Sequence, residues 1–208
     1  IVFKIGPRIN AAGRMETGRL AVALLTASDD HTATMIGEKI NDNNNDRKSI
    51  DREITQEALE MVQNGSALST DAATIVYNPT WNKGVVGIVA SRLVEAFYKP
   101  TIVLTKSNGF ITGSARSVAG FDLYEAIESC ADLLENFGGH VYAAGLTLKE
   151  GNLEEFVGRI DKFIAGKITE EMLTPMTDID AKLEFSQITP KFSRLWKQFQ
   201  PFGPGNCD

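Results

Sequence analysis

The chain has 208 residues, 43% hydrophobic and 23% charged, with a formal net charge of −6. This length allows one large core or two small ones. It contains no apolar run of the roughly 18–20 residues that a membrane helix needs, and its N-terminus shows no secretory signal pattern. The two cysteines, Cys130 and Cys207, stand far apart without companions, which argues against a disulfide framework or a zinc site and indicates a cytoplasmic protein.

The acidic net charge argues against a surface that binds nucleic acid everywhere, but the charges are unevenly distributed. Basic residues outnumber acidic ones in residues 1–28 and again in 78–117, whereas acidic residues dominate 118–190. Basic patches on an acidic protein favour a local, directed anion-binding surface. The alternative is that the charges lie by chance on solvated faces.

Residues 1–66 predict helices. A Gly6-Pro7 break precedes a short helical pattern that runs to Leu25, and apolar residues then follow a loose 3.6-residue period from 32 to 63. The nearly wholly polar stretch 41–48 is either part of a solvent-bridging helix or a break between two helices. Asp29-Asp30-His31 precedes this pattern, where Asp is a routine helix cap, so we interpret it as a cap and not a metal site.

Strand and helix patterns alternate through the middle of the chain. The expected strands cover residues 73–77, 101–105, 110–114 and 142–148, and the expected helices cover 87–98, 122–137 and 153–168. Asn108-Gly109 predicts a tight hairpin turn, and Asp122 with Glu125 predicts a capped helix start. This order predicts an α/β fold with a mixed β-sheet flanked by helices. A short strand at 178–185 and a helix at 189–199 indicate the start of another unit.

Residues 138–145, Gly-Gly-His-Val-Tyr-Ala-Ala-Gly, form the most informative segment, and we expect it between a helix and a strand. The glycines Gly138 and Gly139 allow a ligand to approach the backbone closely and direct N–H groups at an anion. His140 adds a side chain that can donate a hydrogen bond to a phosphate oxygen. The alternative is a helix stop followed by a buried strand, with His140 a core residue.

A second cluster, residues 113–117, follows the sequence Gly-Ser-Ala-Arg-Ser at the end of an expected strand. The guanidinium of Arg116 with the hydroxyl of Ser114 can hold a phosphate through a planar fork and a short O–H donor. The alternative is a surface arginine at a strand end.

A third cluster, residues 81–87, leads into an expected helix whose next turn carries Arg92. Glycines before a helix N-terminus open its free N–H groups to an anion. The paired valines in this segment could equally pack in the core. Trp81 either stacks on a base or is partly buried, which is the commoner arrangement.

A fourth cluster, residues 6–14, mixes turn residues with Arg8, Asn10 and Arg14 and indicates contact with a phosphate backbone. No Asp and His residues stand together at metal-ligand spacing, and nothing resembles a nucleophilic triad or a Walker loop. We therefore expect no metal in this chain.

Taken in order, five segments resemble the RecJ family of single-stranded-DNA-specific 5′→3′ exonucleases, within the DHH phosphoesterase superfamily. They are residues 6–15, 81–92, 113–117, 137–145 and 201–206. The Gly-Gly-His element marks the DHHA1 domain of the superfamily, whereas the first and last segments are more specific to RecJ. Two positions depart from the family pattern: Asn82 stands where histidine is usual, which weakens a proton-donor role there, and Cys207-Asp208 replaces Pro-Glu.

The resemblance implies that the chain is a piece of a longer protein, consistent with its opening on Ile1 within an apolar run. Residues 1–28 would be the tail of a DHH-type catalytic domain, 29–66 a connecting helix, 67–170 a DHHA1-like substrate-binding domain and 171–208 the start of an OB-like domain. The family's Mn²⁺ or Mg²⁺ would be bound by the preceding DHH domain. We therefore expect the chain alone to be inactive.

The resemblance also implies roles for individual residues. His140 would be catalytic, and Arg116 with Ser114 would hold a terminal or adjacent phosphate and so select the 5′ end. The implied phosphate- or DNA-binding residues are Arg8, Asn10, Arg14, Trp81, Asn82, Lys83, Arg92, Ser114, Arg116, Gly138, Gly139, Ala143, Ala144 and Gly145. The implied partners are single-stranded DNA and a single-strand-binding protein or helicase, with a role in DNA repair and recombination.

Two alternative functions remain. One is a phosphoesterase of the same superfamily for very short oligonucleotides or cyclic dinucleotides, against which the RecJ-specific segments argue. The other is a non-catalytic DHHA1-type module for nucleic-acid binding or oligomerisation.

Overall fold

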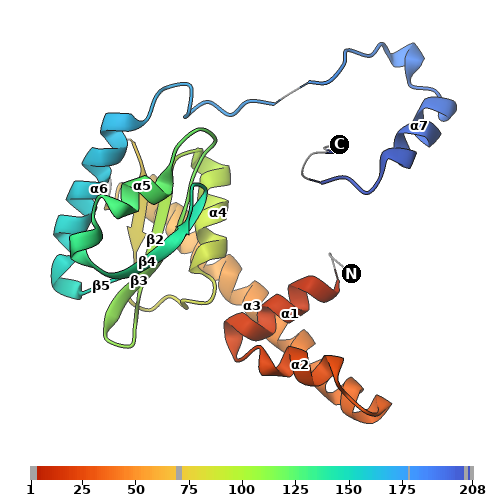
Figure 1. Ribbon diagram of the computed structural model, residues 1–208, viewed down its shortest axis with the longest axis horizontal. Helices are drawn as coiled ribbons and strands as arrows, with labels where there is room; N and C mark the ends of the chain where they lie inside the picture. The colour runs from red at the N-terminus through yellow and green to blue at the C-terminus, as the bar shows by residue number, and fades with distance from the viewer. Residues whose placement is uncertain (1–3, 69–71, 178, 204–205, 207–208) are drawn as a thin grey trace. The chain divides into compact units, whose positions relative to one another are not determined.

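A computed structural model describes residues 4–68, 72–177, 179–203 and 206 of the chain. The chain divides into two compact units, residues 1–174 and residues 175–208 (Figure 1). The first unit holds three helices followed by a helix-flanked sheet, and the second holds a short helix with its flanking turns.

The first unit begins with α1 (Ile5–Met15), α2 (Arg19–Leu25) and the long α3 (Asp30–Gln63). Gly6-Pro7 does not break α1, because Pro7 falls in the first turn, where its missing N–H leaves no helix bond unmade. Asp29 caps α3 by accepting the N–H of Thr32 at 2.8 Å, as expected.

The polar stretch 41–48 continues α3 without interruption, so the alternative of a break between two helices is wrong. The helices α1 and α2 both pack against α3. Asn44 and Asp51, within and just after the polar stretch, are each 1% exposed, so polar residues here are buried against neighbouring elements. Although α3 is long, none of the described helices is apolar enough to cross a membrane.

The second half of this unit is a five-stranded sheet in the order β1-β2-β3-β5-β4. Its strands are β1 (Thr74–Tyr77), β2 (Thr101–Ser107), β3 (Phe110–Arg116), β4 (Leu134–His140) and β5 (Ala143–Leu148). β1 and β2 are parallel and the other neighbouring pairs are antiparallel, which confirms the mixed sheet. Asn108 and Gly109, with φ of 52° and 81°, form the tight turn between β2 and β3 that the Asn-Gly pair predicts.

Helices cover both faces of the sheet (Figure 1): α5 (Leu123–Glu128) and α6 (Leu153–Lys167) on one face, α4 (Val86–Phe97) on the other. Side chains alternate between the faces of a strand. Ile102 of β2 therefore packs in the α5 and α6 core, whereas its neighbour Val103 packs under α4. On the α4 face, Gly138, His140 and Gly145 of β4 and β5 are exposed.

The expected helix at 122–137 is wrong in its second half. Asp122 caps it as expected, with its carboxylate accepting the N–H of Glu125 at 3.0 Å, but α5 ends at Glu128 and residues 134–140 form the edge strand β4. Leu133, Leu134 and Phe137 fit both the helical and the strand pattern of apolar residues. Pairing with β5 makes the segment a strand. Gly138-Gly139-His140 therefore ends a strand and does not lie between a helix and a strand.

The second unit contains α7 (Pro190–Trp196), which Thr189 caps by accepting the N–H of Phe192 at 3.2 Å. The strand expected at 178–185 is wrong for the described residues 179–185, and position 178 lies outside the described part. A strand needs a neighbour for its backbone hydrogen bonds, and the described residues of this unit provide none. Asn206 closes the loop after α7 by donating to the carbonyl of Phe199 at 2.8 Å.

Candidate nucleic-acid interface

The sheet register brings separate sequence clusters into two adjacent rows on the α4 face. Across β3, β5 and β4, Arg116 pairs with Ala143, which pairs with His140. Two residues away along the strands, Ser114 pairs with Gly145, which pairs with Gly138. Because residues paired across a sheet point to the same face, Arg116, Ser114 and His140 lie on one face with only small residues between them.

The glycines of the second row are not required by packing within this chain. A Cβ built on Gly138 would meet nothing within 4 Å, and one built on Gly145 would meet only the carbonyl oxygen of Gly113, at 3.8 Å. Their missing side chains therefore keep the face open.

Gly139 has a different role. Its φ is +157°, and a Cβ there would lie 2.2 Å from the carbonyl oxygen of Ala143. The close approach of β4 and β5 at the hairpin therefore requires glycine at this position.

His140 is exposed at the end of β4. Its Nδ1 accepts the main-chain N–H of Tyr142 at 3.3 Å. The rings of His140 and Tyr142 lie edge to face, with their centroids 6.4 Å apart. Because Nδ1 accepts this hydrogen bond, Nε2 is the ring nitrogen left to donate. The imidazole can therefore present an N–H donor to a ligand on the open face.

Arg116 and Ser114 form a preassembled pair of donors. Nη1 of Arg116 donates to Oγ of Ser114 at 2.9 Å and to the carbonyl of Ala115 at 2.7 Å. A Cβ on Gly87 would lie 3.0 Å from both Nη2 of Arg116 and Oγ of Ser114, so the first turn of α4 lies directly against the pair.

The N-terminus of α4 adds positive potential at this point. Its N-cap, Val85, has no side chain that can accept the first N–H groups of the helix. Such an end attracts anions through its N–H groups and the helix dipole. Burial lowers the pKa of Arg116, and the positive charge of Arg14 lowers it further. A bound anion would offset both effects.

The loop before α4 rests on the end of α1. Nη1 of Arg14 donates to the carbonyl of Gly84 at 3.1 Å, and Oδ1 of Asn82 accepts the N–H of Gly84 at 2.8 Å. Asn82 thus holds the loop turn, while Lys83 is exposed. The side chain of Arg8 joins α1 to α3, because its Nε donates to Oδ1 of Asn41 at 3.1 Å.

Asn10 and Arg14 line a cavity of about 180 Å³ between α1, α3 and α4. Its other lining residues are Pro7, Ala11, Arg47 and Ile88. Arg47 was not among the residues selected from the sequence. The i, i+3 and i, i+4 spacing of Asn44, Arg47 and Asp51 on one helix face is the signal that could have identified it.

Three further selected residues also have side chains directed away from the open face. Trp81 is 4% exposed and its indole N–H donates to Oε2 of Glu57 at 2.7 Å, so the buried alternative holds. Ala144 is buried on the α5 and α6 face, opposite His140. Arg92 is paired with Oδ2 of Asp51 at 2.8 Å, joining α4 to α3.

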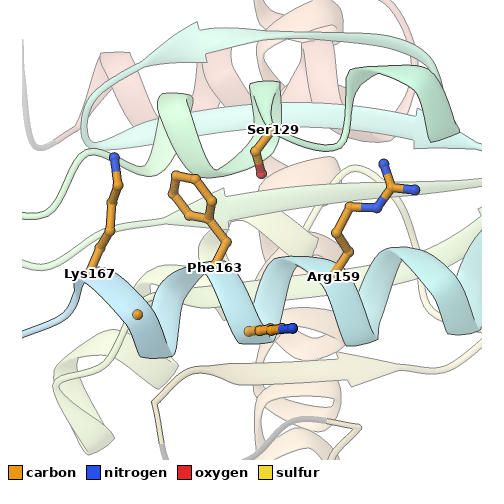
Figure 2. A pocket seen from close by; sticks show the side chains of 6 residues that line it. Ser129, Arg159, Phe163 and Lys167 are labelled. Atoms are coloured by element: carbon orange, nitrogen blue, oxygen red, sulfur yellow. The ribbon is translucent and has the colours of Figure 1, made fainter.

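Another hollow, of about 440 Å³, lies on the α5 and α6 side of the sheet (Figure 2). It is lined by Ser129, Arg159, Lys162, Phe163, Gly166 and Lys167. Arg159 pairs with Asp132 at 2.6 Å, and Lys167 pairs with Glu125. These carboxylates neutralise two of the cations, so this hollow has less to attract an anion than the Arg116 site.

Across the described ranges, no group of three or more His, Cys, Asp or Glu residues could hold a metal ion. Asp29 accepts two hydrogen bonds from Thr32, which lower its pKa, and so acts as the cap of α3.

Comparison with known proteins relates this arrangement to one group. Residues 70–166 match the DHHA1 domain. The chain is 38% identical over 203 residues to the single-stranded-DNA-specific exonuclease RecJ of Bacillus subtilis, covering 97% of this chain and 26% of that protein. It is 32% identical over 208 residues to RecJ of Salmonella typhimurium, covering 97% of this chain and 36% of that protein.

The fold matches a crystal structure of Thermus thermophilus RecJ in complex with Mg²⁺ at a TM-score of 0.86 and 29% identity, covering 99% of this chain and 31% of that one. The same protein has also been solved with Mn²⁺. The chain thus spans about a quarter to a third of the length of the curated relatives it matches. The sequence and structural agreement together identify the chain as RecJ-like, with a DHHA1 domain that contains the five-stranded sheet.

Proposed function

We propose that this chain is the substrate-binding part of a RecJ-like exonuclease that degrades single-stranded DNA from its 5′ end. The observation that carries the proposal is the pair of rows on the α4 face, which places Arg116, Ser114 and His140 around exposed glycines. In this proposal, residues 1–28 end a DHH-type domain, 29–66 connect it to the DHHA1-like domain at 67–170, and 171–208 begin an OB-like domain.

Arg116, Ser114 and the N-terminus of α4 would bind the 5′-terminal phosphate. A planar guanidinium beside a hydroxyl provides donors in several directions, and the helix end adds N–H groups and positive potential. The half-buried Arg116 loses hydration on the protein side, so it gains more from pairing with a doubly charged terminal phosphate than an exposed arginine would.

His140 would contact the phosphate at which cleavage occurs. Its Nε2–H can donate to a phosphate oxygen, and the hydrogen bond from Tyr142 to Nδ1 holds the ring in place. The open positions at Gly138 and Gly145 would let the sugar-phosphate backbone lie against the sheet. The roles of these residues are binding, orientation and charge stabilisation.

The described residues of this chain do not fit a metal site. We place the Mn²⁺ or Mg²⁺ ions on the DHH-type domain, where they would activate water for attack on phosphorus. We also infer a cytoplasmic protein of DNA repair and recombination, with a single-strand-binding protein or a helicase as partner.

Two alternatives make different predictions. A non-catalytic binding module would bind single strands without distinguishing a 5′-phosphate from a 5′-hydroxyl. A phosphoesterase for short oligonucleotides or cyclic dinucleotides would lose activity as the substrate lengthens.

Binding of labelled oligothymidylates to the purified chain tests the proposal. We expect a 5′-phosphorylated strand to bind more tightly than the same strand with a 5′-hydroxyl, and a blunt duplex to bind most weakly. Arg116→Gln should remove the preference for the 5′-phosphate. Equal affinity for the two single strands would contradict the 5′-end proposal and favour the non-catalytic module.

A further inference from the structure

Arg47 is held in a fixed position on the face of α3 that meets the cavity between α1, α3 and α4. Its Nη2 donates to Oδ1 of Asn44 at 3.2 Å, and its Nη1 lies 3.4 Å from Oδ2 of Asp51. Its side chain is only 14% exposed. Much of the entropy cost of ordering a long side chain is thus already met before any ligand arrives.

The charges around this arginine do not balance. The carboxylate of Asp51, 1% exposed, receives Arg92 at 2.8 Å as well as Arg47, so one negative charge faces two positive charges. Arg14 lines the same cavity, and its described hydrogen bond goes to the uncharged carbonyl of Gly84. The cavity wall therefore keeps positive charge that a bound anion can neutralise.

The cavity differs in position from the Arg116 pair. Gly87 faces Arg116 and Ser114, whereas the next residue, Ile88, lines the cavity. Consecutive residues of a helix point about 100° apart around its axis. The two sites therefore lie on different sides of the first turn of α4.

We propose that Asn10, Arg14 and Arg47 form a second phosphate subsite, which takes an internucleotide phosphate of the strand whose 5′ end is at Arg116. This inference rests on the proposed function and adds to it a residue, Arg47, and a second point of attachment. Two guanidiniums and the Asn10 amide can donate to one phosphate group, and Asp51 with Asn44 holds Arg47 toward it.

A second phosphate contact has a measurable consequence. Each phosphate that a protein neutralises on a single strand contributes about 0.7 to the slope of log affinity against log salt concentration. We measure binding of the purified chain to a 5′-phosphorylated oligothymidylate over a range of NaCl concentrations. Arg47→Gln should reduce the slope by about 0.7 and weaken binding.

Two variants separate charge from structure. Arg52→Gln removes an exposed arginine from the same helix, five residues on, and should leave slope and affinity unchanged. Arg47→Lys keeps the charge and loses the planar fork, so it should keep the slope while weakening affinity. All assays are run well below the thermal midpoint of each variant. A slope that Arg47→Gln leaves unchanged while the variant is folded overturns the second subsite.

Methylphosphonate substitution, which removes the charge of one phosphate at a time, locates the contact. Arg47→Gln should have no additional effect when one particular internucleotide position is already neutral, whereas Arg116→Gln should be coupled to the 5′-terminal phosphate. Coupling of Arg47 to the terminal phosphate instead would overturn a separate subsite. If the effect of Arg47→Gln is instead coupled to the removal of one base and to no phosphate, the cavity binds a base and the proposal is overturned.

Failure of the two proposals can be distinguished. No binding of single strands by the unaltered chain would overturn the proposed function together with the subsite. Binding with a 5′-phosphate preference that depends on Arg116, but with the same salt slope in Arg47→Gln, would overturn the subsite alone.

Discussion

Arg14 and Gly84, 70 residues apart in the sequence, are joined by a hydrogen bond of 3.1 Å from Nη1 of Arg14 to the Gly84 carbonyl. The backbones of these two residues also approach closely, because a Cβ on Gly84 would lie 2.3 Å from the main-chain oxygen of Arg14. The end of α1 thus fixes the loop that leads into α4, and it brings the charge of Arg14 close enough to lower the pKa of Arg116.

Gly84→Ala should therefore disturb the binding site around Arg116 indirectly, through the loop that leads into α4. The added methyl group must displace backbone, and overpacking of this kind costs about 1–3 kcal/mol. We expect a lower thermal midpoint and weaker binding of 5′-phosphorylated single strands. Gly151→Ala, where a Cβ meets nothing within 4 Å, is the matched control and should change neither property. Normal binding and stability in Gly84→Ala would contradict this coupling.

The two glycines of β4 should respond in opposite ways. Gly138→Ala places its methyl group in open space, so the fold should keep its stability while DNA binding weakens. Gly139→Ala combines a positive φ with a 2.2 Å contact and should destabilise the fold by about 1–3 kcal/mol or more. Thermal unfolding and strand binding are measured on both variants. Unchanged DNA affinity in Gly138→Ala would show that no ligand lies against this position.

His140→Ala should reduce turnover in a protein that carries both this chain and the DHH-type domain. Loss of one preorganised donor to a phosphate that gains charge in the transition state costs about 10²–10³ in kcat. The thermal midpoint should be unchanged, because the side chain is exposed. His140→Gln, which keeps an N–H donor, should retain more activity. A His140→Ala protein that melts several degrees early yet turns over normally when folded would return this residue to a structural role.

Arg116→Ala should weaken recognition of the strand end more than general affinity for DNA, because its contact is local. Rates on 5′-phosphorylated and 5′-hydroxyl substrates are compared in the protein that includes the DHH-type domain. Arg159→Ala, on the opposite side of the sheet in ion pairs with Asp132 and Glu155, is the control. Retention of the unaltered protein's preference would exclude Arg116 as the end clamp.

The chain alone should not hydrolyse DNA, because its described residues do not gather the carboxylates and imidazoles that a metal-dependent phosphodiesterase needs. Labelled single-stranded DNA is incubated with the purified chain and Mn²⁺, and nucleotide release is followed. Release that persists after contaminating nucleases are excluded would contradict the proposed division of labour.

Local signals in the sequence determined much of the fold. Asp29 and Asp122 cap helices, and Asn108-Gly109 closes a hairpin, because each acts through hydrogen bonds or backbone angles within a few residues. The alternation of strand and helix likewise predicts the mixed sheet, since the patterns of period 2 and 3.6 reflect which faces are buried.

The tertiary structure decided the rest. Whether residues 134–137 form helix or strand depended on pairing with β5. Residues 179–185 lack their expected strand because the described part of their unit offers no neighbouring strand. The burial of Trp81 against Glu57 and the position of Arg47 beside Arg14 likewise depend on how α1, α3 and α4 pack. The sequence motifs identified Arg116 and His140 as candidate site residues. Only the tertiary structure places them in one row, because β3 pairs with β5 although no hairpin turn joins these two strands and sets their register.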